Sequence, residues 1–170
     1  MAKRPMMYLM CGPAGSGKST WIRRNAEPGT SAHISRDRIR FSKVKEDEYY
    51  FAREDEVYEE FVYQIVAALQ APWVDSIYVD ATHLTQKARE KLIRQVDEII
   101  NIDYWYDITA VVVMPELEVC LAQNAQREGR ERVPESVIRN MYKSFQHPLK
   151  DDLRYNCIIE NDNIVYGEVK

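Results

Sequence analysis

The chain has 170 residues, of which 45% are hydrophobic and 29% charged, which is enough apolar side-chain surface for one core. Its formal net charge of −4 does not suggest a nucleic-acid-binding protein. No apolar run approaches the ~20 residues of a membrane helix. We therefore expect one domain over residues 1–170 and no membrane association.

The cysteines and the charge distribution narrow the class further. Cys11, Cys120 and Cys157 lie in apolar segments without metal-ligand spacing, which favours reduced, buried thiols and a cytoplasmic protein. The first 45 residues carry ten Lys or Arg and two Asp or Glu, whereas residues 46–60 carry one and eight. This asymmetry indicates a localised anion site on an otherwise acidic protein.

The hydrophobic pattern alternates strands and helices. Apolar runs predict strands at residues 7–11, 32–35, 77–81, 108–114 and 156–160, with a possible terminal hairpin after the last. Helical periodicity predicts helices from Lys18 to about Asn25, within 46–72, after an N-cap at Thr85, after Pro115 and after Pro134. Strands separated by such helices form a mostly parallel sheet with helices on both faces. The predicted fold class is α/β, a three-layer αβα arrangement with about five strands.

A phosphate-binding loop follows the first predicted strand. Residues 12–19 read G-x-x-x-x-G-K-S, between an apolar strand and a helix. The glycines let backbone N–H groups converge on phosphate oxygens, and the helix N-terminus adds positive charge. Lys18 would reach the β- and γ-phosphates, and the Ser19 hydroxyl would ligate Mg²⁺. We therefore predict that ATP is bound by Gly12, Pro13, Ala14, Gly15, Ser16, Gly17, Lys18, Ser19 and Thr20.

Charged residues follow two other predicted strands, at the edge of the sheet where ligands bind. Asp80 ends the third strand and would hold Mg²⁺ directly or through water, although a strand-end Asp also caps ordinary turns. Asp37 lies among three arginines in HISRDRIR, residues 33–40. A kinase needs a carboxylate that orients the acceptor hydroxyl and accepts its proton, and arginines suit an acceptor that bears phosphate. The alternative is a solvated face on which Asp37 is only an ion-pair partner.

A second group of arginines lies in QREGRERVP, after the helix that follows Pro115. Arg127, Arg130 and Arg132 surround a glycine and would form a mobile lid over the triphosphate. A solvated loop between two helices is the alternative.

Four segments together resemble one family. GPAGSGKSTW, ISRDRIR, VDATHLT and NAQREGRERVPESVIRNMYKSF are similar, in order and spacing, to the kinase domain of phage-type 5′-polynucleotide kinases over roughly residues 6–146. The resemblance implies a P-loop kinase fold with an arginine-bearing helical lid, and ATP and Mg²⁺ as cofactors. It also implies roles for individual residues. Asp37 would be the general base on the 5′-hydroxyl, Arg40 would contact the substrate phosphate, Asp80 and Thr82 would support the acceptor, and Arg127, with Arg130, would serve ATP from the lid.

Phage enzymes of this family continue into a phosphatase domain. We expect none here, so end repair would need a separate phosphatase or ligase partner. The acidic segment 46–60 is expected to face away from the substrate. The aromatic residues of 49–63 are expected to pack in the core rather than stack on bases, and His33, His83 and His147 are expected to be structural or surface residues.

Three functions remain open at this point. The first is ATP-dependent phosphorylation of the 5′-hydroxyl ends of DNA or RNA. The second is a small-molecule kinase for a nucleoside, sugar or nucleotide-sugar on the same fold. The third is an ATP-binding regulator that transfers no phosphoryl group.

Overall fold

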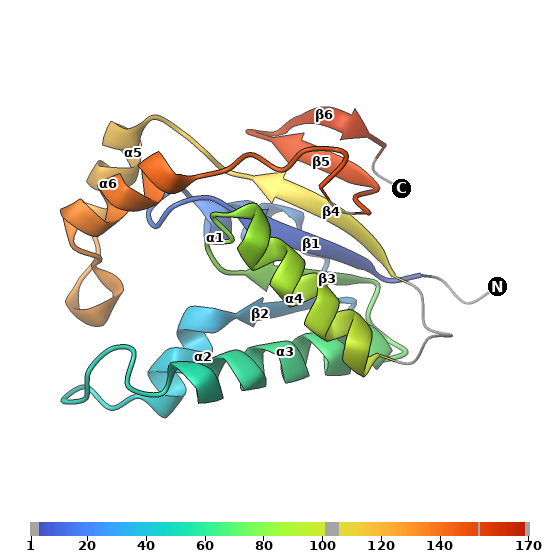
Figure 1. Ribbon diagram of the computed structural model, residues 1–170, viewed down its shortest axis with the longest axis horizontal. Coiled ribbons are helices and arrows are strands. Elements are labelled where there is room, and N and C mark those ends of the chain that lie inside the picture. The colour runs from blue at the N-terminus through green and yellow to red at the C-terminus, as the bar shows by residue number, and fades with distance from the viewer. Residues whose placement is uncertain (1–3, 101–105, 153, 169–170) are drawn as a thin grey trace.

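A computed structural model describes residues 4–100, 106–152 and 154–168 (Figure 1). Within these ranges the strands are β1 (Met6–Cys11), β2 (Ser31–Ser35), β3 (Ser76–Asp80), β4 (Asp107–Val112), β5 (Cys157–Glu160) and β6 (Asn163–Gly167). The helices are α1 (Lys18–Asn25), α2 (Arg36–Lys43), α3 (Glu54–Gln70), α4 (Gln86–Ile99), α5 (Leu117–Ala125), the 3-10 helix η1 (Gly129–Glu131) and α6 (Glu135–Ser144).

The strands form a single sheet in the order β2-β3-β1-β4-β5-β6. Neighbouring strands from β2 to β5 are parallel, whereas β6 runs antiparallel to β5. The predicted mostly parallel sheet is confirmed. The possible terminal hairpin is formed by β5 and β6, which adds a sixth strand to the sheet. The carboxyl ends of β1, β2, β3 and β4 therefore meet at one edge, where ligands bind in open parallel sheets.

Helices cover both faces of the sheet, as predicted. On one face the large core cluster packs Phe61 and Ile65 of α3 and Leu92 of α4 against Leu9 and Val79 of the central strands. A smaller cluster on the other face packs Trp21 and Ile22 of α1 against Met10 and Val111. Figure 1 shows α4 in front of the sheet, α3 alongside β2, and α5 and α6 beyond the carboxyl ends of the parallel strands.

A local sequence signal explains where α4 begins. The Thr85 hydroxyl accepts a hydrogen bond from the backbone N–H of Ala88 at 3.2 Å, so the predicted N-cap of α4 is confirmed. The three cysteines are buried and free, as predicted. The part of the chain that the structure describes holds no helix that is both long and apolar enough to cross a bilayer.

Two elements differ from the sequence prediction. The helix expected within 46–72 begins only at Glu54, because the chain before it forms turns. The arginine-rich segment after β2 forms helix α2, which was not predicted. Ser35 caps that helix by accepting from the N–H of Arg38 at 3.4 Å, so Asp37 lies in the first turn, where the helix dipole favours a carboxylate.

Candidate functional site

The phosphate loop has a conformation that its glycines alone allow. Gly12 has φ +147°, and a Cβ there would lie 2.2 Å from the carbonyl oxygen of Val113. Gly15 has φ +77°, and its Cβ would lie 2.3 Å from the carbonyl oxygen of Cys120. Side chains at these positions would clash with backbone that cannot yield. The loop is therefore held against β4 and α5 as well as against α1.

The loop presents donors to an anion at the start of α1. Gly17 caps α1 without a side-chain hydrogen bond, which leaves the first N–H groups of the helix available. The buried Ser16 hydroxyl has no hydrogen-bond partner among the described residues. The Lys18 ammonium donates to the carbonyl oxygens of Gly12 at 3.0 Å and Pro13 at 2.8 Å. These groups fit the phosphates of a nucleotide, as the sequence predicted.

Lys18 is electrostatically coupled to the other predicted site residues. Burial lowers the pKa of its ammonium, the carboxylates of Asp80 and Asp37 oppose that shift, and the Arg127 guanidinium adds to it. The fold therefore brings Lys18, Asp80, Asp37 and Arg127 from four separate segments within range of one another.

Ser19 and Asp80, the two residues predicted to hold Mg²⁺, contact each other. The Ser19 hydroxyl donates to Oδ2 of Asp80 at 3.1 Å, and Nε2 of His33 lies 2.9 Å from the same oxygen. Burial alone would raise the pKa of Asp80, but the bond to His33, the Lys18 charge and the bond to Ser19 outweigh it and hold the pKa below its usual value. An ionised carboxylate beside a hydroxyl fits Mg²⁺, which takes one or two protein oxygens together with phosphates and water. The described residues contain no group of three His, Cys, Asp or Glu that would hold a metal alone.

Asp37 is exposed and held at one oxygen. Its side chain is 64% exposed, and Oδ1 accepts from Nη1 of Arg40 at 2.5 Å and from the Tyr50 hydroxyl at 3.1 Å. No described residue donates to Oδ2. The carboxylate is therefore fixed in orientation while one of its oxygens remains open to an acceptor hydroxyl.

Arg40 is buried and bound by two carboxylates, those of Glu54 and Asp37. Its side chain is 6% exposed. Nε donates to Glu54 at 3.1 Å, Nη2 donates to both Glu54 oxygens at 3.0 Å, and Nη1 also reaches the Tyr50 hydroxyl at 3.1 Å. Arg36 donates to the same Glu54 carboxylate, so two arginines share one acid.

These contacts overturn the expectation that the acidic segment faces away from the site. Glu54 faces the arginines of α2, because α3 packs directly against α2. Glu48 and Glu56 instead pair with Arg53, at 3.4 and 3.8 Å. Three acids of the negative run, Glu48, Glu54 and Glu56, are therefore counterions for nearby arginines.

The lid arginines occupy three different places. Arg127 is half-buried and close enough to influence the Lys18 charge. Arg130 reaches across to α2 instead: its Nη1 donates to the carbonyl oxygen of Val44 at 2.7 Å, and its guanidinium lies 4.8 Å from the ring centre of Phe41. Arg132 is exposed. The base of the lid is fixed by Asn124, a buried side chain that exchanges two hydrogen bonds with the backbone of Val133.

The loop after β3 is tied to the phosphate loop. The carbonyl oxygen of Thr82 accepts from the N–H of Gly12 at 2.9 Å. Next to it, the buried ring of His83 contacts the carbonyl oxygen of Met10 through Nδ1 at 2.6 Å, and fully buried Arg89 donates to the His83 carbonyl at 3.0 Å. Thr82 also lines a groove of about 400 Å³ between α3 and α4, together with Arg36, Tyr58 and Lys91.

Sequence reasoning missed three residues of this site. Glu54 and Tyr50 lie in a segment that reads as a solvated acidic run, and only the packing of α3 on α2 brings them to Arg40 and Asp37. His33 was expected to be structural or on the surface, but it contacts Asp80. His33 lies two residues before Ser35, which is paired with Asp80, but this register is known only from the structure.

Comparisons with known proteins agree with this geometry. A family model described as an AAA domain matches residues 7–148. The chain is similar to a fungal RNA kinase, with a TM-score of 0.66 and 17% identity, over 92% of this chain and 38% of that one. It is similar to a chain of a Pnkp1/Rnl/Hen1 RNA repair complex, with a TM-score of 0.65 and 20% identity, over 85% of this chain and 45% of that one.

A gluconokinase from Sinorhizobium meliloti 1021 has a TM-score of 0.54 and 15% identity, over 94% of this chain and 82% of that one. The chain thus spans less than half the length of the two RNA-processing proteins and most of the length of the gluconokinase. At these identities the likeness shows the fold, which is that of the P-loop kinases, and does not distinguish nucleic acid from a small molecule as acceptor.

Proposed function

Because the chain belongs to the AAA domain family and has a P-loop kinase fold, we propose that it transfers the γ-phosphoryl group of ATP to the 5′-hydroxyl of a nucleic-acid end. The observation that carries the proposal is the Asp37 carboxylate, which is fixed at Oδ1 by Arg40 and Tyr50 and open at Oδ2. A general base needs this combination of fixed orientation and free access to the acceptor proton.

The transfer proceeds in one displacement. The acceptor oxygen forms a bond to the γ-phosphorus while the bond from that phosphorus to the bridging oxygen breaks, and ADP leaves. Oδ2 of Asp37 takes the proton of the acceptor hydroxyl. Lys18 and the N–H groups at the start of α1 hold the phosphates, and Arg127 lies on the lid, where its charge would stabilise the transferring group.

Magnesium would be held by Ser19 and Asp80. When bound, it neutralises charge on the β- and γ-phosphates. His33 keeps Asp80 oriented by its contact with Oδ2, and the lowered pKa keeps that carboxylate ionised at neutral pH.

The test is transfer of labelled γ-phosphate to a single-stranded 5′-hydroxyl oligonucleotide, with DNA and RNA in parallel. Asp37→Asn should abolish labelling while retaining ATP binding, and Asp151→Asn, which removes an exposed carboxylate elsewhere, should retain both. ATP binding without labelling of either oligonucleotide would refute the proposed acceptor.

A small-molecule kinase is the second candidate, and the groove between α3 and α4 favours it. Its volume of about 400 Å³ suits a nucleoside or sugar, and Thr82, Arg36 and Lys91 offer polar contacts beside the site. A panel of nucleosides and sugars as acceptors would show label on a small molecule and none on oligonucleotides if this candidate holds.

A further inference from the structure

Four aromatic rings form a cluster on the surface between α2 and α3. These are Phe41, Tyr49, Tyr50 and Phe51, which we call the aromatic cluster. Tyr50 packs edge-on against Phe51 at 4.8 Å and against Phe41 at 6.2 Å, and Tyr49 packs against Phe51 at 5.8 Å between ring centres. The two outer rings, Tyr49 and Phe51, are 73% and 50% exposed. The expectation that the aromatic residues of 49–63 belong to the core is wrong for these two and for Tyr63, which is also exposed.

The outer rings are continuous with the acceptor side of the site. The Arg40 guanidinium lies 4.7 Å from the ring centre of Tyr50 and 5.4 Å from that of Phe51. The Tyr50 hydroxyl donates to Asp37. Tyr50 therefore lies between Phe51 and the Asp37 carboxylate that would accept the proton.

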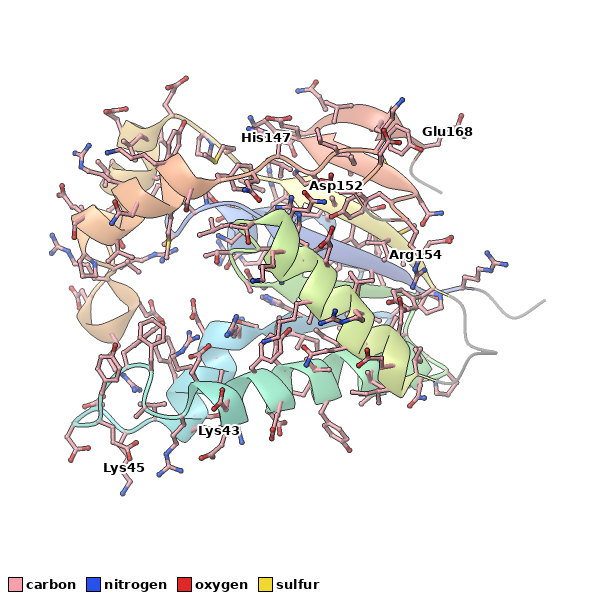
Figure 2. All side chains as sticks on the ribbon, in the orientation of Figure 1. Lys43, Lys45, His147, Asp152, Arg154 and Glu168 are labelled. Carbon is pink, nitrogen blue, oxygen red and sulfur yellow. The ribbon has the colours of Figure 1, made fainter. Side chains whose placement is uncertain are left out.

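The charges around the outer rings favour a neutral ligand surface over a phosphate. Residues 46–48 are Glu, Asp and Glu. Lys43 and Lys45, labelled in Figure 2, point toward the lower edge of the view, away from α5 and α6, and Lys43 lies 4.0 Å from Glu60. Residues 43–53 carry three Lys or Arg and three Asp or Glu, so a phosphate gains no net attraction here. A base, which has no charge and two π-faces, would instead stack on exposed rings.

On the premise that the acceptor is a nucleic-acid end, as proposed above, we propose that Tyr49 and Phe51 form a stacking platform for a base of the acceptor strand. The base belongs to the second to fourth nucleotide, on the 3′ side of the nucleotide that receives the phosphate. The first nucleotide must place its 5′-hydroxyl at Asp37, and the strand then leaves past Arg40 toward Phe51. A platform of this kind tolerates any base and gives the enzyme a preference for strands over single nucleotides.

The test combines protein variants with abasic substrates. KM is measured for single-stranded 5′-hydroxyl DNA that carries one abasic site at the first, second, third or fourth nucleotide. With the unaltered protein, an abasic site at the second, third or fourth nucleotide should raise KM about tenfold or more, which is the scale of one lost stacking contact. The double variant Tyr49→Ala/Phe51→Ala should raise KM for intact DNA by a similar factor. In this variant, the abasic site that raises KM for the unaltered protein should cause no further increase in KM.

Three controls separate stacking from other effects. Tyr63→Ala removes a ring that is 67% exposed on α3, outside the aromatic cluster, and should keep the full penalty for the abasic site. Phe51→Leu keeps apolar bulk against Tyr50 and should retain a smaller penalty. The KM for a nucleoside 3′-phosphate, which has no second base, should be unchanged in the double variant.

Two results would overturn the platform. One is the absence of any abasic penalty at the second to fourth nucleotide in the unaltered protein, and the other is an equal penalty in the double variant. If intact DNA is still labelled in either case, only the platform is refuted and the proposed function remains. If no oligonucleotide is labelled, the proposed function itself is refuted.

Discussion

Replacing Glu54 by glutamine tests whether this residue holds the acceptor side of the site together. Glu54 is the shared counterion of Arg36 and Arg40, and Arg40 is 6% exposed. Glu54→Gln keeps the shape of the side chain but leaves a buried guanidinium with Asp37 as its remaining carboxylate. Breaking a buried ion pair costs about 3–5 kcal/mol, and we expect roughly 3 kcal/mol because Glu54 itself is 29% exposed and Asp37 still compensates in part.

The matched control is Glu56→Gln in the same turn of α3. Glu54 and Glu56 both lie in the first turn, so their contributions to the helix dipole are similar and cancel in the comparison. Glu56 is 59% exposed and lies 3.8 Å from Arg53, an exposed pair worth about 0–1 kcal/mol. Because a loss of 1 kcal/mol lowers the Tm of a domain of this size by about 2–4 °C, Glu54→Gln should lower Tm by about 6–12 °C and Glu56→Gln by at most about 4 °C.

Thermal unfolding followed by circular dichroism at low and high salt would check both values. The Glu54→Gln loss should persist in about 1 M salt, because a buried pair is screened less than an exposed one, while any Glu56→Gln loss should disappear. Equal Tm shifts for the two variants would refute the view that Glu54 anchors the arginines of α2.

Three further predictions concern the proposed reaction and its pH range. Asp37→Asn should lower kcat by a factor of about 10²–10⁴ with KM for ATP unchanged, measured by transfer of labelled phosphate. Asp80→Asn should raise the Mg²⁺ concentration at half-maximal activity by about tenfold or more, measured by titration of the metal at saturating ATP. Burial lowers the pKa of His83 to about 4, with Arg36 and Arg89 adding to the shift and Asp80 opposing it. As pH falls, His83 is therefore protonated in the unfolded chain at a higher pH than in the folded protein. The stability that neutral His83 contributes is therefore complete above about pH 6.5 and lost toward pH 4, a difference of roughly 3 kcal/mol in unfolding free energy. Urea unfolding at pH 7 and pH 5 should show this slope in the unaltered protein and a smaller one in His83→Gln.

The phosphate loop and the sheet could be predicted because their signals are local. The run from Gly12 to Ser19 carries its own glycine spacing, and each buried strand is a short apolar run between turn residues. The Thr85 cap likewise needs only its neighbours in the sequence. In each case the physical requirement is met within a few residues, so the pattern identifies it.

The contacts around Asp37 and Arg40 could not be predicted in the same way. They join residues that are far apart in the sequence, at spacings that are typical of no motif. Glu54 lies 14 residues from Arg40 and 18 from Arg36, across a turn segment of no regular structure. The helix α2 is short and polar, and buries only Ile39 and Arg40, so its hydrophobic pattern is weak. Its stability comes from α3, whose contacts with it are tertiary.

The geometry of Arg40 adds a second role to the one that the family resemblance implies for this residue. The resemblance implies that Arg40 contacts the substrate phosphate, but its Nε and Nη2 donate to Glu54 and its Nη1 donates to Asp37 and Tyr50. A phosphate reaches this guanidinium only by replacing the Tyr50 hydroxyl at Nη1. The same Nη1 fixes Oδ1 of the base, so a phosphate bound there would lie beside Asp37. Binding the acceptor and orienting the base would then be one event, and the bonds from Glu54 would hold the guanidinium in place for both.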